Sequence, residues 1–403
     1  MKTRFRMGKR PPLQFLNFIF LQILSSAFLI LPILTTIKVS PNDASDLIAY
    51  FSFASNFAIG FTKSVLITSL SLKGYSKNGN HYSQFSVSNF QITGVLVILQ
   101  FTLSVILLPN IITTLLILHC GLLAMMKLEY RCQSKAISGN WKGAIGTYLF
   151  LITFFLGGLS AISLLRDVNS KIIIELWATS IILISLCLFI HDYRDRKEKT
   201  EVEFFTGDTR STLAMDFLLN YGLMQLIYSV ATTLTNSNEM IKYRLLMFLS
   251  IPTNIVMQAL STSGLTFMFG DHKKSKEKLL IFDLLASAPV IIIVMIFANI
   301  DSESLSTLLG ETWSEIPFLL PYFLVMSLSA VFLSHTAMIV KWRGLTKSLL
   351  YKRILVSALQ IPFTLFAIRH SGAIGILFSL VIFNTLFTAV NLHAIKRELS
   401  HES

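Results

Sequence analysis

Three ionisable side chains interrupt long apolar stretches of this sequence, and they are the first candidates for chemistry. Lys63 lies seven residues before Leu70, which is the inner end of its apolar run. At about 1.5 Å per helical residue, Lys63 is therefore about 10 Å deep in the membrane. Asp216 and Asp283 lie near the inner ends of two other runs. A lysine at the centre of a membrane helix costs about 2.5–3.5 kcal/mol, so it is normally paired, hydrated or functional. Lys63 therefore binds an anion, pairs with Asp216 (the favoured partner) or Asp283, or extends to the cytoplasmic surface; the two aspartates are also candidates for ion coupling.

Polar side chains recur on one face of several apolar runs. Asn56, Gly60 and Lys63 are spaced four and three residues apart, which places them on one helical face. Three other runs carry similar polar stripes. Together the stripes predict a hydrated cavity, and we expect the residues that face its substrate to include Asn56, Gln225, Asn254 and Gln258. The alternative is that each polar group bonds across packed helices, a contact worth about 0.6 kcal/mol on average.

Two cations and two histidines complete the set of candidates. Lys242 and Arg244 lie at the outer end of an apolar run, where they either anchor the helix at lipid headgroups or bind a substrate anion. His119 and His335 lie within runs, with no carboxylate or second histidine at helical spacing, so we expect both to be packed. The three cysteines have no paired or metal-ligand spacing, so the sequence predicts no metal site.

The elements that must position these residues are membrane helices. The chain of 403 residues is 53% apolar and 14% charged, with a mean hydropathy of +0.65, whereas soluble chains carry about 25% charged residues. A spanning helix needs about 20 mostly apolar residues. We count about twelve such runs, with a turn at Pro109-Asn110 dividing the third from the fourth: 13–37, 47–70, 90–108, 111–126, 144–165, 172–190, 213–234, 245–269, 279–300, 316–340, 349–368 and 374–392.

The positions of the basic residues indicate the orientation of these helices. With the amino terminus in the cytoplasm, 27 Lys and Arg residues fall in inside segments, six fall in outside loops or helix ends, and Lys63 remains within a run. Because cytoplasmic loops are enriched in Lys and Arg, both termini are predicted to be cytoplasmic. The net charge of +12 is then explained by topology, and no nucleic-acid partner is needed.

The longest polar stretch lies in the middle of the chain and divides it into two halves of six helices. We predict an amino-terminal lobe at 1–192, a cytoplasmic linker at 193–210 and a carboxyl-terminal lobe at 211–403, arranged as parallel repeats around a central cavity. The expected fold is an all-α polytopic membrane protein. The loops leave no room for a soluble catalytic domain and carry no G-x-x-x-x-G-K-[ST] motif, so we expect neither an enzyme nor a cofactor.

Local motifs then suggest a family. The stretch Tyr228–Leu234, the pentapeptide Met240–Arg244, the element Leu308–Trp313 and the segment Tyr130–Gln133 resemble elements of the multidrug/oligosaccharidyl-lipid/polysaccharide exporter (MOP) superfamily. Within it, the chain is most similar to polysaccharide-biosynthesis flippases of the O-antigen type.

This resemblance implies that the chain moves an undecaprenyl-diphosphate-linked oligosaccharide outward across a bacterial plasma membrane by alternating access. Lys63, and then Arg244, would receive the pyrophosphate. The implied partners are the lipid-linked oligosaccharide and the bilayer, with a polysaccharide polymerase and glycosyltransferases as candidate protein partners.

Two other functions stay open. A drug/cation antiporter of the same superfamily would use acidic residues in the cavity, for which Asp216 and Asp283 are the candidates. A membrane polysaccharide polymerase or ligase would need a large outside loop rich in arginine and histidine, whereas the longest outside loop here, 301–315, is acidic and short.

Overall fold

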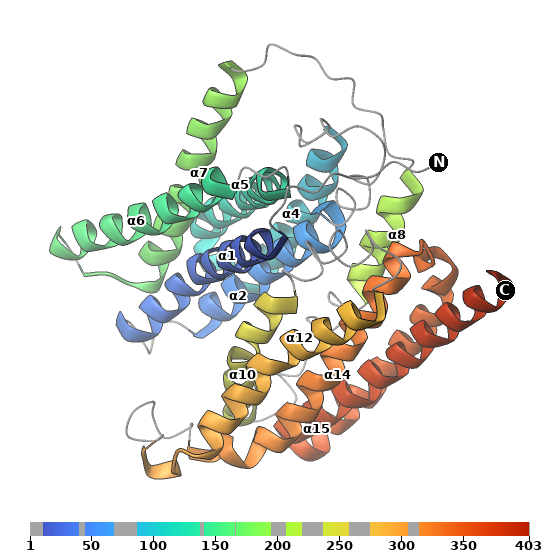
Figure 1. Cartoon of the computed structure of the whole chain (residues 1–403). Helices are drawn as coiled ribbons and strands as arrows, with labels where there is room; N and C mark the ends of the chain where they lie inside the picture. Colours follow the sequence, from blue (N-terminus) through green and yellow to red (C-terminus); the bar gives the residue numbers. More distant parts are fainter. Residues whose placement is uncertain are drawn as a thin grey trace. The chain divides into compact units, whose positions relative to one another are not determined.

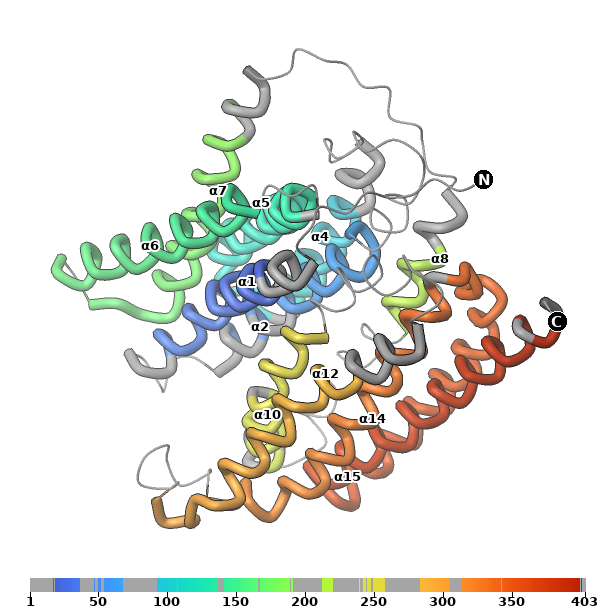
Figure 2. The backbone as a smooth tube through the Cα atoms, in the orientation of Figure 1, coloured from blue at the N-terminus to red at the C-terminus, as the bar shows by residue number. Residues whose placement is uncertain are grey.

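The computed structural model describes residues 11–39, 45–67, 87–137, 141–165, 167–194, 207–219, 237–257, 275–304 and 314–402, which are helical apart from short turns and contain no strand. The chain forms two compact units, Met1–Arg210 and Ser211–Ser403. Figure 1 and Figure 2 trace the helices of each unit in sequence order.

The amino-terminal unit is organised around one helix, α5 (Ile112–Ile137). It packs against α2 (Ser45–Phe61), α4 (Val87–Leu107), α6 (Trp141–Leu165) and α7 (Ser170–Arg194). The helix α1 (Pro11–Val39) completes the unit by packing against α2, α6 and α7. A π-helix, η1 (Thr62–Ile67), continues α2, and a 3-10 helix, η2 (Pro109–Ile111), joins α4 to α5, which confirms the turn predicted at Pro109-Asn110.

An aromatic cluster fixes the helices that surround α5. Trp177 on α7 stacks on Phe28 of α1 at 5.7 Å and meets Phe51 of α2 edge-on at 4.9 Å, while its indole N–H donates to the Phe28 carbonyl over 3.1 Å. Phe155 of α6 packs edge-on against Phe28 at 6.4 Å. Because each aromatic pair contributes about 0.5–1.5 kcal/mol beyond its buried area, this cluster joins four helices.

The helices α5 and α7 approach closely at a glycine. A Cβ built on Gly121 of α5 would lie 2.6 Å from the Ala178 Cβ and 2.8 Å from the Ala178 Cα on α7. Small residues permit such close packing in membrane proteins, where dispersion forces and hydrogen bonds rather than apolar burial hold helices together.

The carboxyl-terminal unit is organised around α14 (Ile316–Trp342), which packs against α10 (Ser237–Leu249), α12 (Ser275–Ala298) and α15 (Thr346–Glu402). The unit also contains α8 (Gly207–Phe217), in which the boundary between the units falls. Its apolar core includes Leu246, Val290, Phe323 and Ile376, one from each of these four packed helices.

The long element α15 is two antiparallel helices joined at Gly372. Its 57 residues would extend about 85 Å at about 1.5 Å per residue, far more than a bilayer core of about 30 Å. Gly372 has φ 54° and ψ −130°, a backbone conformation that favours glycine. Thr364 and Ser379 hydrogen-bond across the two halves, as do Arg353 and Asn391. The separate runs predicted at 349–368 and 374–392 are therefore confirmed as separate helices.

The structure supports a membrane location for the described helices. Six of them are long and apolar enough to cross a bilayer, and α15 supplies one stretch long enough for two crossings: Ile19–Thr36, Pro109–Ala136, Trp141–Leu165, Ser170–Leu188, Ile316–Lys341 and Thr346–Glu398. Large apolar side chains are widely exposed, among them Ile106 at 72% and Leu164 at 87%, which suits a surface covered by lipid. The count of twelve and the cytoplasmic termini stay predictions. Parts of the predicted runs 213–234 and 245–269 lie outside the described residues.

One predicted run ends too early. The sequence placed the end of the fourth run at Met126, but α5 continues to Ile137. Lys127, Glu129 and Arg131 interrupted the apolar pattern, although α1, α6 and η1 cover much of this part of α5. The extension brings Glu129 inside the helical unit.

Candidate functional site

The amino-terminal unit encloses a carboxylate that lies beyond the predicted end of its apolar run. Glu129 is on α5, and its side chain is 0% exposed. Ser25 on α1 donates a hydrogen bond to Oε2 over 3.0 Å, and the Tyr148 hydroxyl on α6 donates to the same oxygen. Gln133, one turn further along α5, donates to Oε1 over 2.9 Å. Three neutral side chains from three helices therefore hold this carboxylate.

Lys63 supplies the opposite charge. Its Nζ lies 3.4 Å from Glu129 Oε1 and donates to Gln22 Oε1 on α1 over 2.5 Å, and its side chain is 10% exposed. The lysine is on the π-helix η1, a wider turn of the kind often found at functional sites. We call these six residues the Glu129 cluster: Gln22, Ser25, Lys63, Glu129, Gln133 and Tyr148.

The Glu129 cluster changes the interpretation of Lys63. The predicted partner was Asp216, but the structure places Lys63 beside Glu129, in the same unit. Its ammonium is therefore neutralised by a carboxylate, as desolvation of a buried cation requires. The polar faces of the first two predicted helices do meet, since Lys63 donates a hydrogen bond to Gln22. Ser25, on the same helix as Gln22, donates to Glu129. It missed Glu129, which the charges around it made look like part of a loop.

The carboxyl-terminal unit encloses a second buried carboxylate. Asp216 on α8 forms an ion pair with Arg353 on α15, and both side chains are nearly inaccessible, at 4% and 2% exposed. Lys341 at the end of α14 places its Nζ 3.8 Å from Asp216 Oδ2. Arg353 also donates to Asn391 Oδ1 over 2.9 Å, and the Asn391 amide donates to Thr336 Oγ1 over 3.1 Å. These five residues are the Asp216 cluster.

Asp283, the other predicted acid, pairs with a histidine. His335 Nδ1 on α14 lies 2.7 Å from Asp283 Oδ1 on α12. The sequence offers His335 no carboxylate at helical spacing, and its partner comes instead from a neighbouring helix. His119 also has a polar partner: Tyr50 OH lies 2.8 Å from its Nε2, and the Leu115 carbonyl lies 2.6 Å from its Nδ1.

Lys242 belongs to a cluster that joins three elements of the carboxyl-terminal unit. Its Nζ lies 2.7 Å from Glu239 Oε1 on α10 and 2.5 Å from Glu315 Oε2, just before α14. The other oxygen of Glu239 accepts the backbone N–H of Ala373 over 3.0 Å, at the start of the second half of α15. Lys242 was expected to bind a substrate anion, but two carboxylates of the same unit already pair with it. A role for Lys242 in binding substrate stays a prediction.

The same contacts shift the ionisation of this surface pair. Burial works against the charged form of Glu239, but the hydrogen bonds from Lys242 and the Ala373 N–H outweigh it and lower the pKa of the carboxyl below its ordinary value. Hydrogen bonds to Glu239 and Glu315 raise the pKa of Lys242 above its ordinary value. Both groups are therefore charged at neutral pH.

The remaining predicted residues divide into two groups. Asn56 is exposed on α2, and Asn254 is exposed and donates to Ser250 Oγ over 3.1 Å. Gln225, Gln258 and the side chain of Arg244 lie outside the described residues. In the part of the chain that the structure describes, no group of three or more His, Cys, Asp or Glu could hold a metal ion.

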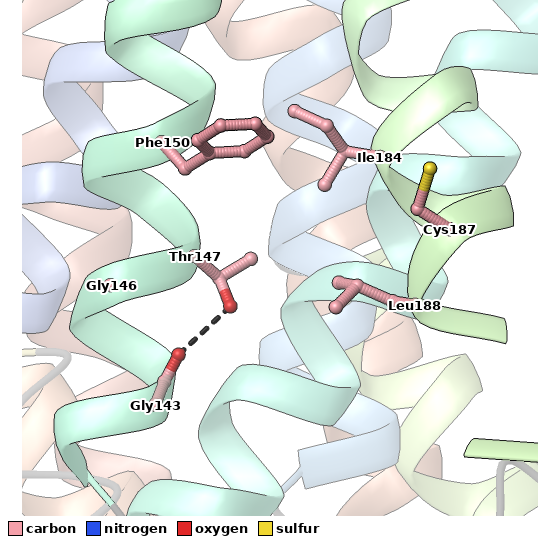
Figure 3. Close-up of a pocket in the computed structure, with 7 residues that line it drawn as sticks. All are labelled: Gly143, Gly146, Thr147, Phe150, Ile184, Cys187 and Leu188. Atoms are coloured by element: carbon pink, nitrogen blue, oxygen red, sulfur yellow. Dashed lines mark hydrogen bonds between the residues drawn. The ribbon is translucent and has the colours of Figure 1, made fainter. Parts of the chain in front are cut away.

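A groove of about 320 Å³ lies between α6 and α7 in the amino-terminal unit (Figure 3). Phe150, Ile184 and Leu188 give it an apolar lining, and its hydroxyl, Thr147, already donates to the Gly143 carbonyl over 2.8 Å. Substrate sites usually carry several convergent polar groups. Apart from Thr147 and the Cys187 thiol, the side chains that line this groove are apolar, which suits a lipid chain better than a polar substrate.

Comparison with known proteins places the fold. No protein-family model matches the sequence, and no curated protein matches it. Solved structures match over nearly the whole chain. An outward-facing multidrug resistance MATE family transporter of the MOP superfamily has a TM-score of 0.68 at 13% identity, covering 98% of this chain and 97% of that chain. The chain has the fold of a MATE-type transporter.

Two more structures of the MATE-type fold give similar values. A MOP superfamily transporter from Pyrococcus furiosus, for which reverse polarity of the binding pocket suggests a different function, has a TM-score of 0.67 at 13% identity, covering 98% of this chain and 97% of that chain. MATE in complex with MaD5 has a TM-score of 0.68 at 14% identity, covering 96% of each chain. The fold of these structures is the one that the predicted superfamily implies. These proteins are transporters, and the chain shares their architecture.

Proposed function

We propose that this protein is an ion-coupled exporter that moves amphipathic, drug-like organic compounds across a membrane by alternating access of its two units. The observation that carries the proposal is the contact between Lys63 and Glu129. A lysine on a polar stripe favours an anionic substrate only if no carboxylate of the protein already neutralises its charge. With Glu129 beside it, the strongest reason to prefer an anionic substrate is removed.

One acidic group inside the helical units supports the same proposal. Glu129 and Asp216 are neutralised by Lys63 and Arg353, whereas Asp283 lies against a histidine. Drug/cation antiporters need carboxylates that bind an ion or a cationic substrate. The likeness to a multidrug resistance transporter over 98% of the chain agrees with this substrate class.

Efflux of cationic dyes tests this proposal. Cells that produce the full chain are loaded with ethidium, rhodamine 6G or tetraphenylphosphonium and then energised. We expect faster loss of at least one compound than in cells with an empty vector, and we expect a protonophore to stop it. Loss at the vector rate for all three, with the protein present in the membrane at normal amounts, would contradict the proposal.

A second candidate is export of a lipid-linked oligosaccharide across the bacterial plasma membrane. The motif resemblance favours it, and so does the position of Lys63, which keeps 10% of its side chain exposed on η1, the continuation of the helix α2 that carries the exposed Asn56. In this case the lipid-linked oligosaccharide, a polymerase and glycosyltransferases would be the partners. Restoration of surface glycan in a strain that lacks its own flippase, without any dye efflux, would support this candidate over the first.

The proposed topology places both termini and the 193–210 linker in the cytoplasm. A cysteine introduced at Ser302 or Ser237 should react with an impermeant thiol reagent in intact cells, whereas one at Ser275 should not. Labelling at Ser275 would reverse the proposed orientation.

A further inference from the structure

The groove between α6 and α7 is open at one end and closed at the other. A Cβ built on Gly146 of α6 would meet nothing within 4 Å. Further along α6, a Cβ built on Gly158 would lie 3.0 Å from the Leu176 side chain of α7. Figure 3 shows Phe150 of α6 and Ile184 of α7 on opposite sides of the open part. The two helices therefore contact each other near Gly158 and leave space near Gly146, close to the beginning of α6.

The groove lies on a surface that lipid covers. Both helices are long and apolar enough to cross a bilayer, and Phe150, which lines the groove, is 59% exposed. The hydroxyl of Thr147 already donates to the Gly143 carbonyl over 2.8 Å, so it needs no partner from an occupant. From Gly143 to Phe150 the groove extends about 10 Å along α6, at about 1.5 Å per residue. This surface therefore suits one hydrocarbon chain that lies along the helices.

A cation lies at the open end of the groove. Lys142 directly precedes Gly143, the first lining residue of α6, and its side chain is exposed. Its Nζ lies 6.0 Å from the ring centroid of Trp141, and tryptophan is enriched where membrane helices meet water. Lys63 and Lys242 pair with carboxylates of their own units, whereas no carboxylate among the side chains that the structure describes pairs with Lys142. Its charge is therefore available to an anionic group at the membrane surface.

We propose that this groove binds one acyl chain of an anionic phospholipid and that Lys142 binds the lipid phosphate. An ammonium donates charge-assisted hydrogen bonds to phosphate oxygens, and Lys142 lies four residues before Gly146, on the helical face that lines the groove. Lys135 adds a second positive charge at this end, because it lies in the last turn of α5, which ends at Ile137 shortly before α6 begins at Trp141. Two cations favour a headgroup with a net negative charge over a zwitterionic one. The lipid site does not depend on which compound the protein transports.

The size of the groove argues against a protein as its occupant. Stable interfaces between proteins involve about 20–30 residues on each side, whereas seven residues line this groove of about 320 Å³. A lipid chain that fills the groove contacts α6 and α7 together. Because a ligand that binds only the folded state stabilises that state, we expect the bound lipid to raise the melting temperature of the protein.

Native mass spectrometry of the full chain, purified in detergent, tests this site. The protein is titrated with dioleoyl phosphatidylglycerol or dioleoyl phosphatidylcholine, and the dissociation constant of the first bound lipid is determined. We expect phosphatidylglycerol to bind at least fivefold more tightly. Lys142→Gln should weaken its binding about fivefold, the effect of one basic residue near an anionic membrane surface, and should leave phosphatidylcholine binding unchanged. Lys171→Gln, at an exposed lysine at the opposite end of α7, is the matched control and should bind both lipids as the wild type does.

A second pair of variants tests the groove itself. Gly146→Phe places a ring in the open space and should weaken the binding of both lipids at least threefold. Gly157→Phe is the matched control, since its Cβ also meets nothing within 4 Å but the residue does not line the groove. It should bind both lipids as the wild type does. If Gly146→Phe is unstable, Lys142→Gln, at an exposed position, carries the test alone.

Four results would overturn the proposal. Equal affinity of the wild type for the two lipids would remove the preference for an anionic headgroup. Wild-type affinity in Lys142→Gln would remove the contact with the phosphate, and wild-type affinity in Gly146→Phe would remove the acyl chain from the groove. A dimer in the same spectra that Gly146→Phe dissociates would assign the groove to a second copy of the chain.

Discussion

The two units bury their carboxylates in different ways. In the Glu129 cluster, one lysine and three neutral donors surround the acid, and these donors come from α1, α5 and α6. In the Asp216 cluster, two cations approach one acid, and Asn391 accepts one hydrogen bond from the arginine. Removing the acid therefore leaves one cation in the amino-terminal unit and two in the carboxyl-terminal unit. The cost of each substitution should follow this difference.

The largest effect is expected at Asp216. Asp216→Asn leaves the guanidinium of Arg353 and the ammonium of Lys341 without their carboxylate, and loss of one partner of a buried pair typically costs about 3–5 kcal/mol. We expect a severe loss of protein from the membrane, measured by quantitative immunoblot and by fluorescence-detected size exclusion. Adding Arg353→Gln should recover part of it. Wild-type abundance of Asp216→Asn would show that the pair is dispensable for stability.

A smaller loss is expected at Glu129. Glu129→Gln keeps the shape of the side chain, and Lys63 keeps its hydrogen bond to Gln22. The loss should be about 1.5–3 kcal/mol, the contribution of a hydrogen bond to a charged group, seen as a lower melting temperature of the detergent-solubilised protein. A variant that is less stable than Asp216→Asn would reverse the comparison between the two clusters.

Packing in the amino-terminal unit gives a third prediction, with a matched control. Gly121→Ala places a methyl group against Ala178, including its backbone Cα, so the helices must shift at a cost of about 1–3 kcal/mol. Gly157→Ala, on α6, meets nothing within 4 Å and should leave the melting temperature unchanged or slightly raised. Equal melting temperatures for the two variants would show that α5 and α7 do not pack as closely as described.

The smallest effect is expected at Glu239. Since its carboxyl has a lowered pKa in the folded protein, its contribution to stability is present at neutral pH and is lost as the pH falls through that lowered value. Glu239→Gln should lower the melting temperature by a few degrees at pH 7, and the difference from the wild type should shrink at pH 4. A difference that grows on acidification would contradict the assigned sign.

The sequence predicts the helices well and their polar contacts poorly. The runs at 144–165 and 316–340 lie within α6 and α14, because a long apolar run flanked by charges has a single physical interpretation. Partners are harder to predict, since each comes from a different helix whose rotation the pattern does not determine. Lys63 was therefore paired with Asp216 instead of Glu129, and His335 was left without Asp283.

The same limit explains the shortened fourth run. Glu129 sits among charged neighbours, and a hydropathy pattern cannot tell that α1, α6 and η1 cover this part of α5. Tyr130 and Gln133 lie three residues apart, a helical spacing, and both side chains are buried on the extended helix. This spacing was the sequence signal that the helix continues beyond Met126.

In this account, Lys63 neutralises Glu129 in the folded protein and does not bind an anionic substrate. A double-mutant cycle tests it most directly, with melting temperature and membrane abundance measured for Lys63→Ala, Glu129→Gln and the double variant. We predict that Lys63→Ala is strongly destabilised, because it leaves the buried Glu129 carboxylate without a positive charge beside it, and that adding Glu129→Gln restores most of the loss. A stable Lys63→Ala protein, or a double variant no better than Lys63→Ala, would contradict the account.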